Sequence, residues 1–332
     1  MRLLKRGTGS GEVTKIFYAT DLHGSEVTWR KFVNAARFYE VDALVCGGDL
    51  MGKVVVPIVR RANGRREADF QGRLTTFDDD AEVASLTSRL ATLGQYWYEC
   101  DEDEYQHIKG DEAEIERLFT RLAKERLGRW VELAEERLAG THIRCFLGGG
   151  NDDTDDVLAV LDQVSKDRVV ACEGRLVELN DRHTMVSLGY STPTPWKTPR
   201  EASDPELAVM IGELMTKVED PSRCIFNFHV PPLDSTLDTC LQLDESVWPP
   251  TPIIRAGQPV EFGAGSGAVR DAIDEHQPLI GLHGHIHESR GSARYGHSQA
   301  VNPGSEYGEG VLRGVIVSLR DDKVLGTQFT SG

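Results

Sequence analysis

The sequence contains no CxxC pair, although six cysteines occur along its 332 residues. Three of them, Cys46, Cys145 and Cys224, lie inside apolar runs, where cysteine behaves as a small buried side chain. This spacing argues against a structural zinc cluster and against a disulfide framework. It indicates a reducing environment, so we expect a cytoplasmic protein.

Long apolar runs are also missing. No stretch approaches the roughly 18 apolar residues that a membrane span needs. The N-terminal stretch MRLLKRGTGSG is basic, but the apolar segment of a signal peptide does not follow it. We therefore expect a soluble protein without a membrane partner.

Positive charge is scarce: 37 Lys and Arg residues stand against 53 Asp and Glu residues, which gives a net charge of -16. This deficit argues against a nucleic-acid-binding surface spread over the whole protein and against an anionic membrane as partner. An anionic substrate remains compatible with it, because bound cations can invert the field locally.

The pattern of apolar residues predicts an α/β protein. Hydrophobic residues make up 39% of the chain, which is enough for a core, and no internal repeat is visible. Residues 13–20 suit a strand, residues 25–40 a helix capped by Ser25, and residues 41–50 contain a second buried strand. This order predicts a βαβ unit with parallel strands. Further strand-like runs after residue 141 lack long helices between them, which indicates sheet-on-sheet packing.

Residues 57–140 interrupt this pattern. They begin with a polar, turn-rich stretch and continue with charged, amphipathic, helix-forming segments such as residues 111–140. We interpret them as a helical insertion in a single domain spanning residues 1–332, with the charged runs as solvated helix faces. A lid and a dimer surface both fit such a segment.

Residue types that bind metals follow the ends of successive predicted strands. These residues are Asp21, His23, Asp49, Asn151, His229, His285 and His287. Strand ends lie side by side in a sheet, so residues that are far apart in sequence can converge there. We therefore expect these side chains to form one site.

Taken singly, most of these signals are weak. The Asp-x-His and Gly-Gly-Asp stretches also suit capping and turn roles, and His229 suits a buried core histidine. The GHIH stretch is stronger, because His285 and His287 point the same way in a strand and Gly284 leaves room for a close approach. The ordered set as a whole makes chance a poor explanation.

The stretches DLH, GGD, GGGN, FHV and GHIH, in this order, resemble the calcineurin-like metallophosphoesterase family, whose pattern is DxH, GD, GN, H and GHxH. The series runs from residue 21 to residue 287, and VNPGS at 301–305 resembles the segment that commonly follows it. The resemblance implies a four-layer α/β/β/α sandwich with a two-metal centre at the strand ends.

The resemblance also implies how the ligands divide between two divalent metal ions. The implied ligands of one ion are Asp21, His23 and His287. Those of the other are Asn151, His229 and His285, and the bridging carboxylate is Asp49. These ligand types suit Mn, Fe, Ni or Zn, and no thiolate is present to favour a softer metal. Such a pair lowers the pKa of a bound water, and the resulting hydroxide would attack phosphorus in line.

One position departs from the family pattern. The family usually has a histidine after the asparagine of the third motif, where it protonates or stabilises the leaving group, but this chain has Asp152. An aspartate with a pKa of about 3.9 is ionised at neutral pH, and divalent cations would lower that pKa further. Asp152 could instead be a structural carboxylate that accepts hydrogen bonds from turn amides. His183 and His283 are other candidate acids, and Lys53 could reach a substrate phosphate or simply begin a helix.

These observations predict a metal-dependent phosphoric ester hydrolase that acts on a small phosphorylated molecule. A phosphodiester is slightly favoured over a phosphomonoester because the expected histidine is absent. The acidic composition weakens a nuclease interpretation. The alternative is a non-catalytic metal-binding scaffold or assembly protein with the same fold. All seven ligand positions carry competent side chains, which favours catalysis.

Overall fold

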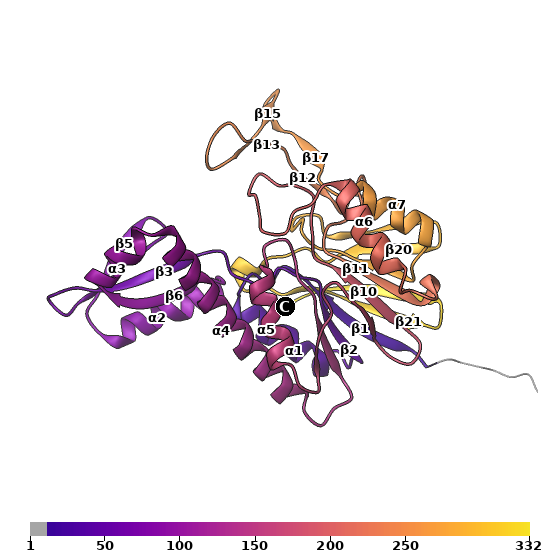
Figure 1. Ribbon diagram of the computed structural model, residues 1–332, viewed down its shortest axis with the longest axis horizontal. Helices are drawn as coiled ribbons and strands as arrows, with labels where there is room; N and C mark the ends of the chain where they lie inside the picture. Colours follow the sequence, from indigo (N-terminus) through magenta and orange to yellow (C-terminus); the bar gives the residue numbers. More distant parts are fainter. Residues whose placement is uncertain (1–11) are drawn as a thin grey trace, which may run out of the picture.

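Two six-stranded sheets pack face to face in the computed structural model, which describes residues 12–332, and helices cover both outer faces (Figure 1). The basic N-terminal stretch lies outside the described residues. None of the helices within residues 12–332 combines the length and the apolar character that a membrane crossing requires. The predicted four-layer α/β/β/α sandwich is confirmed.

The first sheet has the strand order β22-β21-β1-β2-β7-β8. Its strands are β1 (Thr14–Ala19), β2 (Ala43–Cys46), β7 (Arg144–Leu147), β8 (Val169–Ala171), β21 (Arg313–Arg320) and β22 (Lys323–Ser331). The first four run parallel, as the βαβ pattern predicts, and β21 and β22 form an antiparallel hairpin at the edge. The helices that cover it are α1 (Glu26–Phe38), α4 (Glu112–Leu138) and α5 (Asp155–Val164).

The second sheet has the strand order β19-β20-β18-β11-β10-β9. Its strands are β9 (Leu176–Glu178), β10 (Thr184–Leu188), β11 (Cys224–Phe228), β18 (Ile280–Leu282), β19 (Gly291–Tyr295) and β20 (Ser298–Asn302). Strands β10, β11, β18 and β20 run parallel, so their carboxyl ends share one edge. The helices that cover this sheet are α6 (Asp204–Met215) and α7 (Gly267–His276).

Side-chain alternation along the central strands builds the layers. In β1, Ile16 and Tyr18 are fully buried between the two sheets, while Phe17 and Ala19 are buried under the helices of the first sheet. A strand that is buried on both faces has no polar side, which explains why these strands read as continuous apolar runs in the sequence. The polar residues that follow them therefore mark the strand ends clearly.

The insertion is only partly helical, so the predicted helical insertion at 57–140 is wrong for its first part. A four-stranded sheet of order β5-β4-β3-β6 projects from the body, on the left in Figure 1. The elements of this part are β3 (Val55–Arg60), β4 (Arg66–Phe70), β5 (Arg73–Phe77), α2 (Asp80–Thr92), β6 (Tyr96–Asp101) and α3 (Glu102–Lys109). The β-branched residues in VVVPIVR and RLTTF favour strands, and this signal outweighs the charge pattern.

The long helix α4 joins the projecting sheet to the body. Its second half is a core helix, because Leu127, Trp130, Val131 and Ala134 are buried in the same cluster as the first sheet. Their helical spacing gives one continuous apolar stripe.

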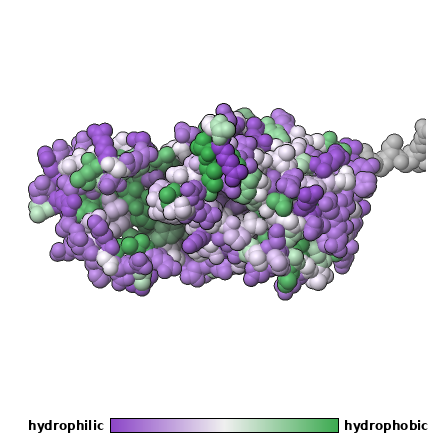
Figure 2. All heavy atoms as spheres, turned by 90° about the horizontal axis from the view of Figure 1, so that it is seen from above, coloured by the Kyte–Doolittle hydropathy of each residue, from purple (hydrophilic) through white to green (hydrophobic). Residues whose placement is uncertain are grey.

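A second projection is an arm of short strands, at the top in Figure 1. Its strands are β12 (Thr239–Leu241), β13 (Leu243–Asp244), β14 (Thr251–Pro252), β15 (Ile254–Arg255), β16 (Gln258–Pro259) and β17 (Glu261–Gly263). The surface is largely hydrophilic in Figure 2, with apolar residues gathered at a few places. On the arm, Trp248 and Ile254 are exposed.

Candidate metal centre

The predicted site residues gather where the parallel strands of both sheets end. The loops that carry them are hydrogen-bonded to one another through the backbone: the Asp21 amide donates to Gly48 O at 3.0 Å and the His23 amide to Asp49 O at 2.8 Å. The Gly284 amide donates to His229 O at 2.9 Å, which joins two loops of the second sheet. All seven predicted ligand positions therefore lie in one cluster of interlocked loops.

Asp21, His23 and His287 form the first group of side chains that could hold a metal ion. The Nε2 atom of His287 lies 3.2 Å from Asp21 Oδ1 and 3.1 Å from His23 Nε2. Asp21 and His23 are fully buried, and burial lowers the pKa of His23 well below its usual value. A neutral imidazole of this kind offers a lone pair to a cation.

Asp49 lies at the centre of the cluster. Its Oδ2 atom is 3.4 Å from His23 Nε2 and 3.5 Å from His229 Nε2. It belongs to a second ligand group with Asp21 and His229 and to a third with His23 and Asp152. Asp49 thus lies between His23 and His229, which the resemblance assigns to different ions, and its bridging role stays a prediction.

Asn151 and His285 complete the cluster. The Oδ1 atom of Asn151 lies 2.7 Å from His285 Nδ1, while its amide group donates to Thr198 Oγ1 at 3.0 Å. Thr198 fixes the orientation of the amide, so the oxygen of Asn151 faces the other ligands. The sequence interpretation does not include Thr198, because it lies in a Pro-rich loop without a motif.

The chemistry of this donor set fits divalent metal ions. The Nδ1–H of His229 donates to Gly47 O at 3.0 Å, so its Nε2 points at the two aspartates, yet this buried atom has no hydrogen-bond partner. Burial alone would lower the pKa of His229, but Asp49 and Asp21 raise it to about 10. A metal ion satisfies the same carboxylates and competes with that proton. Carboxylate, amide and imidazole donors suit Mn, Fe, Ni or Zn.

The backbone is strained at four of these positions. Asp21, His23, Asp49 and His285 have φ angles of 55°, 41°, 51° and 67°, in the left-handed region that residues other than glycine rarely adopt. Such conformations cost on the order of 1–3 kcal/mol each and persist where the surrounding structure imposes them, typically at functional sites. Here the interlocked loops impose them, and the strain turns the side chains toward the cluster.

The glycines before Asn151 leave space and do not provide a sharp left-handed turn. None of Gly148, Gly149 and Gly150 has a positive φ angle. A Cβ atom on Gly150 would lie 2.1 Å from Asp49 Oδ1, and one on Gly149 would lie 2.2 Å from Arg200 Nη1. These glycines therefore allow the loops after β2 and β7 to touch.

Asp152 faces Lys53 at the edge of the cluster. The Lys53 Nζ atom lies 2.6 Å from Asp152 Oδ2, and His23 Nδ1 lies 3.5 Å from the same oxygen. Burial raises the pKa of Asp152 to about 6, with Asp49 acting in the same direction and Lys53 against it. Lys53 begins no helix, because residues 50–54 are irregular, so the helix-start interpretation is wrong.

The structural carboxylate of this turn is Asp153. Its two oxygens accept hydrogen bonds from the amides of Leu50 at 3.0 Å, Met51 at 2.8 Å and Gly150 at 2.9 Å. Burial raises the pKa of Asp153 to about 7, and these amide donors oppose the rise. The structural role considered for Asp152 thus belongs to the next residue.

Replacing Asp153 by alanine is expected to lower the free energy of unfolding by about 3 kcal/mol, because three buried amides lose their acceptor. Urea titration followed by circular dichroism measures the change. Asp156→Ala is the matched control, since Asp156 belongs to the same acidic run but is exposed, and it should alter stability by less than about 0.5 kcal/mol. Equal stability of the two variants would contradict this role of Asp153.

The two other candidate acids, His183 and His283, are not placed to protonate a leaving group. His183 precedes β10 and therefore lies at the opposite end of the sheet, where its Nε2 atom is 2.8 Å from Asp321 O. His283 is fully buried with Nδ1 at 2.7 Å from Phe228 O, and burial lowers its pKa to about 4. The structure instead places Tyr307 beside the cluster, with its ring centre 4.6 Å from that of His23. It follows the VNPGS segment, which is the only signal for it in the sequence.

Comparison with known proteins gives a likeness of structure but none of sequence. No protein-family model and no curated protein matches the chain. One solved protein superposes with a TM-score of 0.57 at 14% identity, over 96% of this chain and 99% of its own. The protein TT1561 of Thermus thermophilus superposes with a TM-score of 0.53 at 14% identity, over 97% of this chain and 99% of its own.

These two likenesses span nearly the full length of the chain and establish the fold alone. The layer order and the gathered motif residues agree with the family pattern that the sequence suggests. The chain thus has the α/β/β/α fold of the calcineurin-like metallophosphoesterases, with the residues of all five motifs at one end of its two central sheets.

Proposed function

We propose that the chain is a metal-dependent phosphoesterase with a dinuclear centre that hydrolyses a small phosphorylated substrate. The observation that carries this proposal is the convergence of all seven ligand-type side chains around His229 Nε2, a buried atom without a hydrogen-bond partner. Strained backbone at four of the seven positions supports it, since a purely structural cluster gains nothing from that strain.

The residues of the proposed site have different roles. Asp21, His23 and His287 would hold one divalent ion. The second would be held by Asn151, His229 and His285, and both ions would share Asp49. When bound, the ions supply Lewis acidity for the phosphoryl oxygens and activate a water as nucleophile. Asp49 balances their charge from the centre, while Lys53 places a half-exposed cation at the edge. Lys53 can therefore bind a phosphate oxygen that the ions leave free.

The edge of the site favours substrates with a good leaving group. Neither His183 nor His283 can protonate a leaving group, and the carboxylate of Asp152 is paired with Lys53. A strongly basic alcohol would leave slowly under these conditions. A phosphodiester is therefore slightly preferred over a phosphomonoester, and the protein is proposed to act in the cytoplasm.

A metal-screened activity panel tests this function. Purified protein is treated with EDTA, reloaded with Mn, Fe, Ni or Zn, and assayed with p-nitrophenyl phosphate and bis-p-nitrophenyl phosphate. We expect EDTA to abolish turnover, at least one metal to restore it, and the diester to be cleaved faster. A protein that takes up two equivalents of Mn and cleaves neither compound, nor any cyclic nucleotide, would instead be a metal-binding scaffold.

Replacing Asp152 by histidine is expected to raise kcat about 10-fold for a monoester with a poor leaving group, such as phenyl phosphate, because the imidazole can donate a proton. Turnover of p-nitrophenyl phosphate, which needs no acid, should change little. Asp152→Asn is the control, since it removes the same charge without adding an acid. Complete loss of activity in Asp152→His but not in Asp152→Asn would contradict this view of the position.

A further inference from the structure

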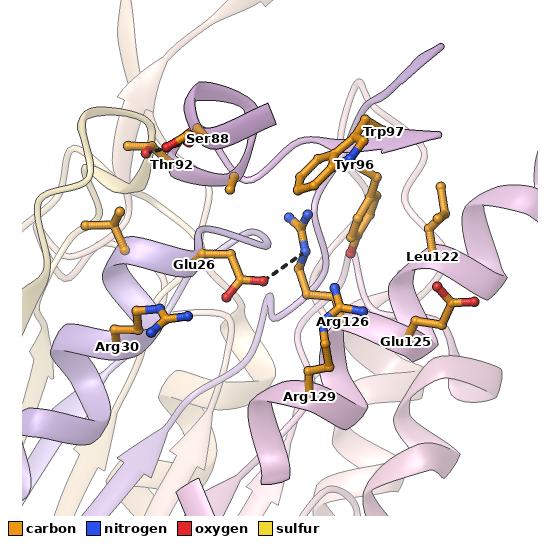
Figure 3. A pocket seen from close by; sticks show the side chains of 12 residues that line it. Glu26, Arg30, Ser88, Thr92, Tyr96, Trp97, Leu122, Glu125, Arg126 and Arg129 are labelled. Carbon is orange, nitrogen blue, oxygen red and sulfur yellow. Dashed lines mark hydrogen bonds and ion pairs between the residues drawn. The ribbon is translucent and has the colours of Figure 1, made fainter. Parts of the chain in front are cut away.

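A cavity separate from the metal centre lies between the insertion and the body of the protein. It has a volume of about 600 Å³ and is bounded by helices α1, α2 and α4 and by strand β6 (Figure 3). This volume lies within the range of small-molecule binding sites, about 300–1,000 Å³. The insertion supplies one wall and the core supplies the other, so the cavity exists only because the insertion folds against the body.

Three arginines line this cavity in a protein that is otherwise strongly acidic. They are Arg30 of α1 and Arg126 and Arg129 of α4. Within residues 12–332, neither Arg30 nor Arg129 forms an ion pair, and both are exposed at the rim. The lining also contains two carboxylates, but Glu125 pairs with Arg121 at 3.2 Å. The other carboxylate, Glu26, pairs with Arg126 at 3.5 Å, so the guanidinium groups left without a carboxylate partner are those of Arg30 and Arg129, and such groups favour an anion.

The buried arginine is held in a fixed position. Arg126 is only 3% exposed, donates to Gly24 O at 2.8 Å, and lies over the rings of Tyr96 at 4.6 Å and Trp97 at 5.4 Å. Figure 3 shows it beside Glu26, whose Oε1 is 3.5 Å from Nε. Glu26 also accepts from the Trp130 indole at 3.1 Å, and Arg126 Nε has no hydrogen-bond partner. The cavity thus contains a preorganised guanidinium group, and its ion-pair partner Glu26 is shared with the Trp130 indole.

Apolar surface lies next to these charges. Trp97 and Leu122 are both half-buried and line the same cavity as the arginines. A ligand with a charged group and a flat or apolar body can use both features, because guanidinium groups bind phosphate oxygens and indole rings bind planar groups. An inorganic ion alone would leave most of the volume to water.

We propose that this cavity binds a small phosphate ester with a planar body, with Arg30, Arg126 and Arg129 facing the phosphate and Trp97 contacting the body. The site does not depend on the proposed catalytic function. It shares no side chain with the metal centre, although Arg126 contacts Gly24 next to His23, and Tyr96 accepts from the Gly52 amide next to Lys53.

Isothermal titration calorimetry of the full chain tests the proposal with AMP, adenosine and inorganic phosphate as probes. EDTA is present throughout, so that metal ions at the other centre do not retain phosphate. We expect AMP to bind at one site, phosphate to bind more weakly, and adenosine to give no measurable heat. The double variant Arg30→Ala/Arg129→Ala should weaken AMP binding at least tenfold.

The matched control is Arg117→Ala, because Arg117 is an exposed residue of the same helix that pairs with Glu114 away from the cavity. It should bind AMP as the unaltered chain does. Because Arg30 and Arg129 are exposed, we expect the double variant to fold, and its thermal unfolding midpoint verifies that it does. No AMP binding by the unaltered chain, undiminished binding by the double variant, or equal binding of adenosine would overturn the proposal.

Discussion

Replacing Asp49 by alanine is expected to lower kcat/KM at least about 10³-fold, which corresponds to about 4 kcal/mol of transition-state stabilisation. Asp49 is 2% exposed, and its Oδ2 atom lies within 3.5 Å of the Nε2 atoms of His23 and His229. In the proposed dinuclear centre, the charge of the two ions would no longer be balanced between the two imidazoles without this carboxylate. Metal content by inductively coupled plasma mass spectrometry should fall together with turnover of bis-p-nitrophenyl phosphate.

The control for this prediction is Asp322→Ala, which removes an exposed carboxylate in the turn between β21 and β22. It should keep both metal content and activity. Circular dichroism establishes that Asp49→Ala remains folded, so that lost activity reports on the centre. Full metal content and unchanged activity in Asp49→Ala would show that Asp49 does not bridge.

Replacing Gly284 by alanine is expected to lower activity about 100-fold, although every predicted ligand remains in place. A Cβ atom at this position would lie 2.4 Å from Thr20 Oγ1 and 2.5 Å from Asp21 Oδ2, both of which are buried. The backbone of Gly284 has no positive φ angle, so the effect comes from the clash alone. The clash displaces Asp21, and a displacement of about 1 Å can cost about 10²-fold in rate.

Metal titration separates this effect from general damage. Gly284→Ala should bind Mn more weakly than the unaltered chain while its unfolding transition stays cooperative. Gly128→Ala is the matched control, because the added Cβ in helix α4 meets no atom within 4 Å apart from its chain neighbours and the backbone of its own helix. That variant should retain full activity and gain up to about 1 kcal/mol of stability. Unaltered metal affinity in Gly284→Ala would show that the close approach at this position is not needed.

The first part of the insertion is where the sequence predicts the wrong secondary structure. Its charged runs obscure the strands β3 to β6, because half-exposed strands outside the main sheets lack a clear alternation of polar and apolar residues. The helix expected within residues 111–140 is confirmed by α4. Its second half nevertheless packs in the core. An amphipathic stripe indicates that one face of a helix is buried but not which element that face packs against.

The acidic run after Asn151 shows a second kind of limit. Asp152 and Asp153 are chemically identical in the sequence, yet the first faces Lys53 and the second accepts hydrogen bonds from three backbone amides. Successive side chains in a turn point in unrelated directions, so neither periodicity nor composition assigns these roles. Only the loop after β2, folded against the loop after β7, separates them.

The sequence by itself determined the layered α/β fold and the group of seven residues at the strand ends, because buried strands leave continuous apolar runs and polar residues stand out directly after them. Only the tertiary structure decided what surrounds these residues. The contacts of Lys53, Thr198 and Tyr307 with the site, and the arginine-lined cavity beside the insertion, join segments that lie far apart in the chain. Their proximity depends on how loops and the insertion pack, and packing between distant segments leaves no local pattern in a single sequence.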